Sequence, residues 1–274
     1  MLFSNYVKNI LTIIVFTTLI NGCSSVGPSN MVELEAREYI DSLDVVIVKP
    51  EDQIYSTLSK GNGARTALML SGGGLAGLAL SNVVRNADNR LVVSKITELN
   101  HDLGGFNYPE IMLSRIEEEI GFIDWAQVND MAVVERQPEM SFDYMREAIT
   151  KSSKSSAVLI MQLDYKIAGE FESIKVNLKA QVYPTIPELN QYKEFEDEEF
   201  DHPESFAPIF SDNFSYTVKY NAPMSRFKKD DHAERVKIRA DYLLENDSER
   251  VKVALMDSIP IISNQLFDGL TRLR

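Results

Sequence analysis

The segment 71–77, Ser-Gly-Gly-Gly-Leu-Ala-Gly, is the part of this chain whose residue types could most directly do chemistry. An apolar segment, 66–70, precedes it and apolar residues at helical spacing follow it, so a strand, a tight turn and a helix are expected. Glycine lets a backbone approach a reacting carbonyl closely, and backbone N–H groups held in this way can stabilise an oxyanion. The same glycines spell G-x-G-x-x-G, with Glu98 at the distance typical of a dinucleotide fingerprint.

The sequence from Leu68 to Gly77 resembles the motif of patatin-like phospholipases, which implies lipid hydrolysis with the glycine turn as an oxyanion hole. That family has a basic residue where this chain has Ala76, and it requires a G-x-S-x-G nucleophile elbow. The one glycine pair with that spacing encloses Leu75 instead of a serine. The surrounding elements do not repeat a βαβ unit, so no dinucleotide cofactor is expected. We therefore predict a structural turn, in which four glycines permit a tight bend or close packing: Gly72, Gly73, Gly74 and Gly77.

Other chemistry-bearing residues are scattered. Three histidines, His101, His202 and His232, each have an aspartate beside them in the sequence. Adjacent residues point in different directions on a helix or strand, so such neighbours do not by themselves form a catalytic dyad. The acidic run 194–204 lacks the ligand spacing and the glycine of an EF-hand loop, and we expect it to be solvated. The sequence thus predicts no catalytic residue, metal site or cofactor, and it favours a non-catalytic role without deciding whether the protein is an enzyme.

The chain's single cysteine, Cys23, ends a segment organised like a secretory signal. Lys8 supplies a basic start, residues 10–20 are uncharged and mostly apolar, and a small residue precedes the cysteine. The apolar run is too short to span a bilayer, which needs ~20 residues. The arrangement resembles the lipobox of bacterial lipoproteins, which implies that residues 1–22 are removed and Cys23 is acylated. In Gram-negative members, a residue other than aspartate after the cysteine, here Ser24, implies the outer membrane, on the side facing the periplasm.

Composition sets further limits. The chain has 274 residues, of which 44% are hydrophobic and 25% charged, enough to build one domain with a substantial core. A net charge of −13, without a basic stripe, excludes nucleic-acid binding. Residues 23–30 have the small, polar composition of a flexible tether, and 31–274 show no composition shift that would divide a single domain. The 71–77 turn and Tyr183-Pro184 are similar to features of uncharacterised Gram-negative envelope lipoproteins, a resemblance that implies no activity.

Hydrophobic periodicity predicts an α+β fold, in which helices cover one face of a mixed or antiparallel sheet. Apolar and polar residues alternate over 174–182, directly after a strand at 157–165, so these two segments should form a β-hairpin. A first helix is expected near 31–42. Two helical pieces near the C-terminus should be separated by a polar break at 245–248, and Pro260 should kink the second piece.

Three functional classes fit these observations. The favoured one is a lipid-anchored, non-catalytic envelope protein that binds or scaffolds partners, held to the membrane through Cys23 and contacting an envelope protein. A patatin-like hydrolase would need a serine nucleophile near the glycine turn. A carrier of small apolar ligands would need an enclosed apolar cavity between the helices and the sheet. The sequence names no partner or ligand and gives no oligomeric state.

Overall fold

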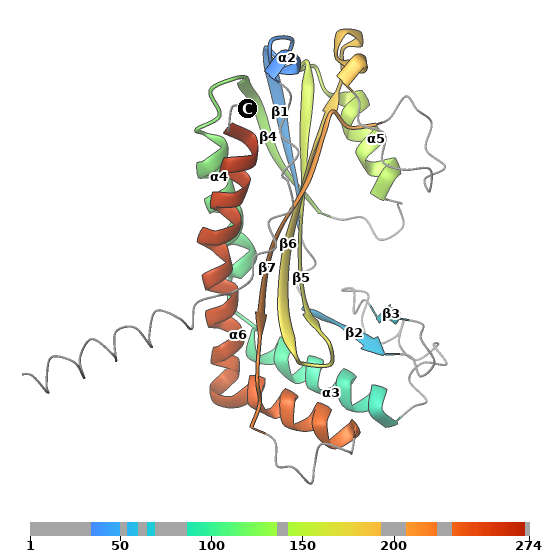
Figure 1. The fold of residues 1–274 in the computed structure, drawn as a ribbon, viewed down its shortest axis with the longest axis vertical. Coiled ribbons are helices and arrows are strands. Elements are labelled where there is room, and N and C mark those ends of the chain that lie inside the picture. The colour runs from blue at the N-terminus through green and yellow to red at the C-terminus, as the bar shows by residue number, and fades with distance from the viewer. Residues whose placement is uncertain are drawn as a thin grey trace, which may run out of the picture.

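The computed structural model describes residues 34–49, 54–59, 65–68, 87–135, 142–192, 207–223 and 232–271. Within them the chain forms helices and strands in the order α2 Leu34–Arg37, β1 Ser42–Lys49, β2 Tyr55–Ser59, β3 Arg65–Leu68, α3 Ala87–Asp102, α4 Tyr108–Ile120, β4 Gln127–Glu135, α5 Phe142–Ser152, β5 Ala157–Ala168, β6 Ser173–Pro184, η2 Pro187–Tyr192, β7 Phe210–Lys219 and α6 His232–Thr271. The predicted α+β fold is confirmed (Figure 1).

The described strands form one mixed sheet, with β5 at its centre. Along one side, β5 pairs with β6 in an antiparallel hairpin that runs from Ala157 opposite Pro184 to Ala168 opposite Ser173, and β7 continues beyond β6. Along its other side, β5 pairs in parallel first with β1 and then with β2. Strand β4 lies beside β1, also in parallel, and β3 lies antiparallel beside β2. The hairpin confirms the prediction from the alternating sequence.

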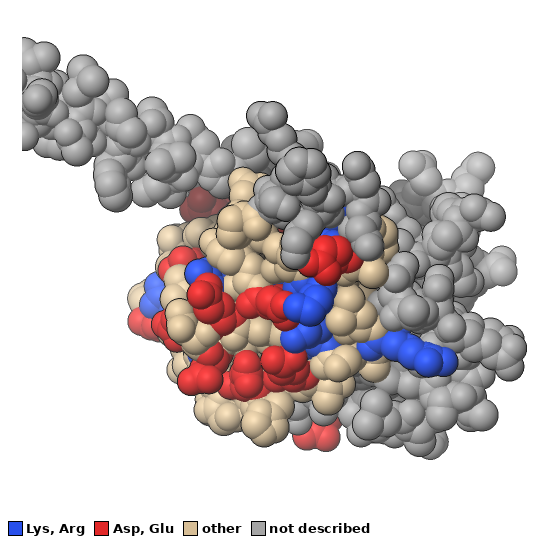
Figure 2. Space-filling view, turned by 90° about the horizontal axis from the view of Figure 1, so that it is seen from below, with Lys and Arg blue, Asp and Glu red and all other residues tan. Residues whose placement is uncertain are grey.

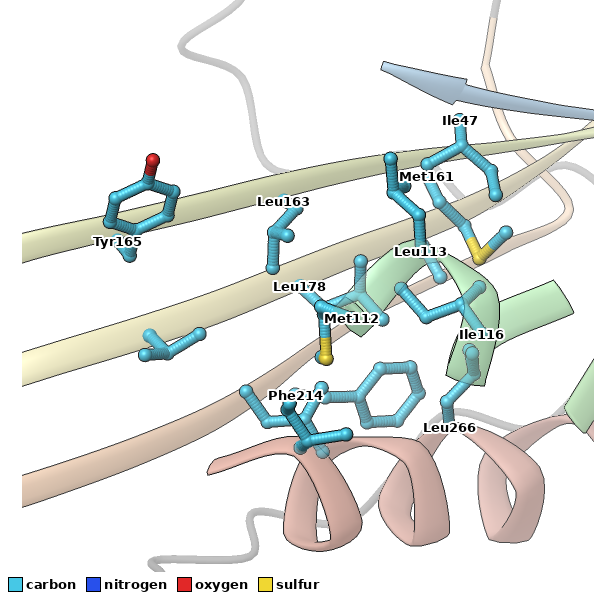
Figure 3. Close-up of a cluster of buried hydrophobic side chains, with 14 of the residues drawn as sticks. Ile47, Met112, Leu113, Ile116, Met161, Leu163, Tyr165, Leu178, Phe214 and Leu266 are labelled. Carbon is cyan, nitrogen blue, oxygen red and sulfur yellow. The ribbon is translucent and has the colours of Figure 1, made fainter. Parts of the chain in front are cut away.

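The main core lies between one face of this sheet and the helices α4 and α6 (Figure 1). Alternate residues of the strands point into it, because successive side chains of a strand face opposite sides of the sheet. Figure 3 shows Leu163, Leu178 and Phe214 from three neighbouring strands facing Met112 of α4 and Leu266 of α6. On the opposite face, a smaller cluster lies under α5, with Met145 buried against side chains of β1 and β5 and the ring of Tyr183.

One local expectation, the first helix, needs correction, and two others concern α6. The helix expected near 31–42 is short, since α2 ends at Arg37 and β1 begins at Ser42; the β-branched run of β1 is buried on both sides and takes this segment into the sheet. The break at 245–248 is confirmed, because three of its residues have φ between 54 and 58°. Pro260, however, lies within continuous helix. It is exposed, so the carbonyl that loses its N–H partner there can face water.

Candidate functional site

Most residues singled out from the sequence lie outside the described part of the chain. This holds for the predicted lipidation site Cys23, for His202 and for the acidic run 194–204. It also holds for the predicted glycine turn, which consists of Gly72, Gly73, Gly74 and Gly77. The structural role of these glycines therefore stays a prediction, and so does the acylation of Cys23.

The two described histidines are in different surroundings. His101 is 91% exposed, and its Nδ1 lies 3.8 Å from Oδ1 of the neighbouring Asp102. His232, at the start of α6, contacts Glu170 in the turn between β5 and β6, with Nε2 and Oε2 2.8 Å apart. The sequence could not predict this second contact, because Glu170 and His232 are 62 positions apart. It identifies the β5–β6 turn as a place where distant segments of the chain meet.

The β5–β6 turn has an unusual backbone. Gly169, Glu170 and Phe171 all have left-handed φ angles, of 60, 53 and 68°. A left-handed conformation costs roughly 1–2 kcal/mol for a residue with a side chain, so Glu170 and Phe171 must be held in place by other contacts. Phe171 supplies one, since its ring is 1% exposed and belongs to the main core. Burial of this ring therefore fixes the position of the turn.

Polar contacts on each side of Phe171 join this turn to the first half of α6. The Glu170–His232 pair is one of them, and the other joins Glu172 Oε1 to Arg239 Nη2 at 2.5 Å. The Arg239 side chain is 18% exposed and the Glu172 side chain 52% exposed, so solvent partly screens this pair. The backbone carbonyl of Glu172 also accepts a hydrogen bond from the N–H of Tyr220, just after β7, at 2.8 Å. Three elements are thus held together at one end of the sheet.

A pocket of about 520 Å³ opens where these elements meet, and we call it the hairpin-tip pocket. This volume lies within the range of small-ligand sites, roughly 300–1,000 Å³. Two cationic side chains and one carboxylate contribute to a mainly polar lining, which consists of Glu172, Ser173, Lys219, Tyr220, Asn221, Ala222 and Arg239. Figure 2 views this end of the molecule and shows basic side chains next to acidic ones across it. Such a lining suits a polar or anionic group more than an apolar ligand.

One side of the pocket is fixed by the break in α6. The Tyr220 hydroxyl donates a hydrogen bond to the backbone carbonyl of Arg250 at 2.9 Å, and burial raises the pKa of Tyr220, so it stays protonated. The Arg250 guanidinium bonds the carbonyl of Tyr242 at 2.7 Å, pairs with Glu245 at 2.8 Å and lies 4.0 Å from the centre of the Tyr242 ring. Arg250 therefore ties together the two helical pieces on either side of the break.

A second pocket, of about 470 Å³, lies beside the first half of α6 where this helix faces α3. Its charged wall contains Asp241, whose carboxylate oxygens lie 2.9 Å from Lys95 Nζ and 2.6 Å from Lys237 Nζ. Desolvation raises the pKa of Asp241, but hydrogen bonds and charge attraction from the two lysines outweigh it and lower the pKa overall. These charges satisfy one another, as Glu172 and Arg239 do in the hairpin-tip pocket; the lining of the hairpin-tip pocket differs in containing a further cation, Lys219.

A cluster of serines and aspartates joins β1 to the segment leading into β5, and sequence reasoning missed it. Asp44 accepts hydrogen bonds from the hydroxyls of Ser153 and Ser155, each at 2.6 Å. Asp41 accepts one from Ser156 at 2.7 Å, and hydrogen bonds from Ser156 and Ser42 lower the pKa of Asp41. These carboxylates are occupied in holding the two strand starts together, so the cluster has a structural role.

Within the described ranges, no group of three or more His, Cys, Asp or Glu side chains is arranged to hold a metal ion. In the same part of the chain, no helix combines the length and the apolar character needed to cross a bilayer.

Comparisons with known proteins add little to this geometry. No protein-family model matches the chain, and no curated protein matches its sequence. Among solved structures, the hypothetical protein CT253 from Chlamydia trachomatis, known at 1.65 Å resolution, is 8% identical. The alignment covers 84% of this chain and 98% of that chain, with a TM-score of 0.29. A similarity this low supports no conclusion about fold or function.

Proposed function

We propose that this protein is a lipid-anchored, non-catalytic envelope protein, attached through Cys23 to the outer membrane and facing the periplasm. In this proposal it binds a partner through the hairpin-tip pocket. The observation that carries the binding role is the pocket itself, whose walls are positioned by buried Phe171 and by the Glu172–Arg239 ion pair. A preformed site loses little conformational entropy when it binds. The anchor is supported by the lipobox resemblance of the sequence that ends at Cys23.

The lining of the pocket favours an exposed polar or anionic group of another envelope component. Lys219 contributes positive charge to the lining, and Arg239 contributes a guanidinium that is paired with Glu172, on a chain whose net charge is −13. A lipid anchor raises the local concentration of binding partners at the same membrane, so even a weak contact would be sufficient. The apolar-ligand carrier remains a less favoured alternative, because the hairpin-tip pocket is open and mainly polar. The patatin-like hydrolase remains an alternative that depends on residues outside the described ranges.

Mass spectrometry of the mature N-terminus tests the anchor. We expect an acylated Cys23, and we expect Cys23→Ser to release the protein from the membrane fraction. An unmodified N-terminus located beyond residue 23 would refute the anchor.

Site-specific photo-crosslinking in intact cells tests the binding site. A crosslinking amino acid at Asn221, exposed at the pocket, should give a reproducible adduct with an envelope component. The matched control is Asn264, which is equally classed as exposed but lies in the second half of α6. Equal adducts from both positions, or none from Asn221, would contradict the proposed site. Turnover of ester substrates by the purified domain through a titratable serine would favour the hydrolase instead.

A further inference from the structure

Five aromatic side chains gather at the end of the body opposite the β5–β6 turn, and we call this group the aromatic end. Tyr39 lies in the turn after α2, and Phe122 and Trp125 lie in the connection between α4 and β4. Tyr192 belongs to η2 and Phe267 to α6. Figure 1 shows α2 and the C-terminal end of α6 together at this end.

Several of these aromatic side chains contact one another or their neighbours. The Phe122 and Phe267 rings meet edge to face with centroids 6.4 Å apart, and the Tyr39 and Tyr192 rings lie 6.1 Å apart. Trp125 donates its indole N–H to a backbone carbonyl of α6 at 2.7 Å and lies under the guanidinium of Arg37, 5.4 Å away. Two members are strongly exposed, Phe122 at 60% and Tyr39 at 43%.

The anchor joins the body at this same end. Helix α2 begins at Leu34 and its last residue, Arg37, contacts Trp125. Residues 24–33 separate Cys23 from Leu34, and even a fully extended segment of that length spans at most ~35 Å. The second half of α6, from Glu249 to Thr271, alone is roughly 35 Å long at 1.5 Å per residue. A lipidated Cys23 would therefore keep the aromatic end close to the bilayer, whereas the hairpin-tip pocket lies at the far end.

The charges at the aromatic end favour a zwitterionic membrane surface over an anionic one. Among the described residues, this end has exposed carboxylates on α2, the α2–β1 and α4–β4 connections and η2: Glu35, Glu38, Asp41, Asp124 and Glu188. Arg37 is only 7% exposed and lies over the Trp125 ring. An anionic membrane would repel these carboxylates within a Debye length, ~10 Å at 0.1 M salt. A zwitterionic surface would not repel them; tyrosine, as at Tyr39, is enriched at the headgroup level, and an exposed phenylalanine such as Phe122 can enter the boundary between headgroups and acyl chains.

We propose that the aromatic end is a lipid-contacting surface, which inserts Phe122 and Tyr39 into the headgroup region of a zwitterionic membrane and directs the hairpin-tip pocket away from it. This inference rests on the proposed attachment through Cys23. It deepens that proposal because it fixes which end of the body faces the lipid and which end faces a partner.

The test attaches the chain without residues 1–22 to vesicles by coupling its single cysteine, Cys23, to a maleimide lipid. Trp125 is the only tryptophan, so quenching of its fluorescence by brominated zwitterionic lipid reports lipid contact at the aromatic end. We expect strong quenching, and Phe122→Ser should lower the ratio of lipid-contacting to detached protein about tenfold, as expected when one Phe side chain leaves an apolar phase. Replacing part of the zwitterionic lipid by anionic lipid should reduce quenching at low salt, and added salt should restore it.

The matched control is Tyr144→Ser, because Tyr144 is also 60% exposed but lies on α5. Both substitutions are at exposed positions, and thermal melts confirm that each variant folds. Weak quenching of Trp125, or equal effects of Phe122→Ser and Tyr144→Ser, would overturn the inference. Because coupling through maleimide does not depend on cellular acylation, such a result would leave the proposed Cys23 anchor intact. An unacylated Cys23 in cells would instead refute the anchor.

Discussion

Asp212 on β7 has a buried carboxylate oxygen that accepts no hydrogen bond. Its Oδ1 accepts a hydrogen bond from the N–H of Asn213 at 2.7 Å, but its Oδ2 is inaccessible to solvent and has no hydrogen-bond partner. Desolvation is the main cause that raises the pKa of Asp212 above its ordinary value, while the Asn213 N–H opposes this rise. Native structures rarely leave a buried polar atom unpaired, so this position should respond measurably to a neutral substitution.

We predict that Asp212→Asn stabilises the protein at neutral pH. An unpaired buried polar atom costs roughly 1–3 kcal/mol, and more if it is charged. Asp212→Asn leaves a polar atom without a partner but removes the charge whose desolvation raises the pKa, and the residue is only half-buried, so we expect a gain of about 1 kcal/mol in the free energy of unfolding. For a domain of this size that corresponds to a rise of about 2–4 °C in Tm. Urea unfolding of the purified domain, followed by circular dichroism, measures the difference directly.

The effect should depend on pH in a defined direction. Because the pKa of Asp212 is raised in the folded state, the folded protein binds this proton more tightly than the unfolded chain does. Stability therefore falls as the pH rises from the ordinary value of 3.8 through the raised pKa, and the full penalty is present above it. The advantage of Asp212→Asn should be complete at pH 7 and should disappear below about pH 4.

Asp44→Asn is the matched control, because both oxygens of Asp44 accept serine hydroxyls at 2.6 Å. This substitution removes one acceptor oxygen from a satisfied carboxylate, and we expect it to destabilise the domain by about 1 kcal/mol or more at pH 7. If Asp212→Asn were destabilising at pH 7, or if its gain were the same at pH 3.5 as at pH 7, the reasoning about its unpaired oxygen would be wrong.

Two further stability predictions follow from the backbone of α6. A Cβ at Gly269 would lie 2.8 Å from Cζ of Phe214, whose ring is 5% exposed, so Gly269→Ala should cost about 1–3 kcal/mol in urea unfolding. Gly121→Ala, at a helical φ of −60°, should change stability by less than about 0.5 kcal/mol, and an equal loss at both glycines would contradict the steric argument. Exposed Asp247 has a φ of 54°, so Asp247→Gly should raise the thermal midpoint by relieving up to about 1 kcal/mol of backbone strain; a lowered midpoint would contradict this.

The local patterns of the sequence were enough to predict several elements of the fold. Strict alternation over 174–182 predicted the β5–β6 hairpin, since a residue's position along a strand fixes which face of the sheet it points to. Polar residues at 245–248 predicted the break in α6, because no apolar side chain there continues the buried stripe. The lipobox resemblance at Cys23 is also purely a property of the sequence. Each of these inferences depends only on residues that are near one another in the chain.

Only the tertiary structure shows how distant segments meet. The β-branched run of β1 indicates burial on both faces, but it does not identify β4 and β5 as its neighbours. Likewise, nothing in the sequence pairs Glu172 with Arg239, or brings the aromatic residues of the α4–β4 connection beside those of α6. The hairpin-tip pocket and the aromatic end exist because parallel pairing and helix packing bring these segments together. Hydrophobic periodicity encodes which side of an element is buried, but it carries no information about which other element covers that side.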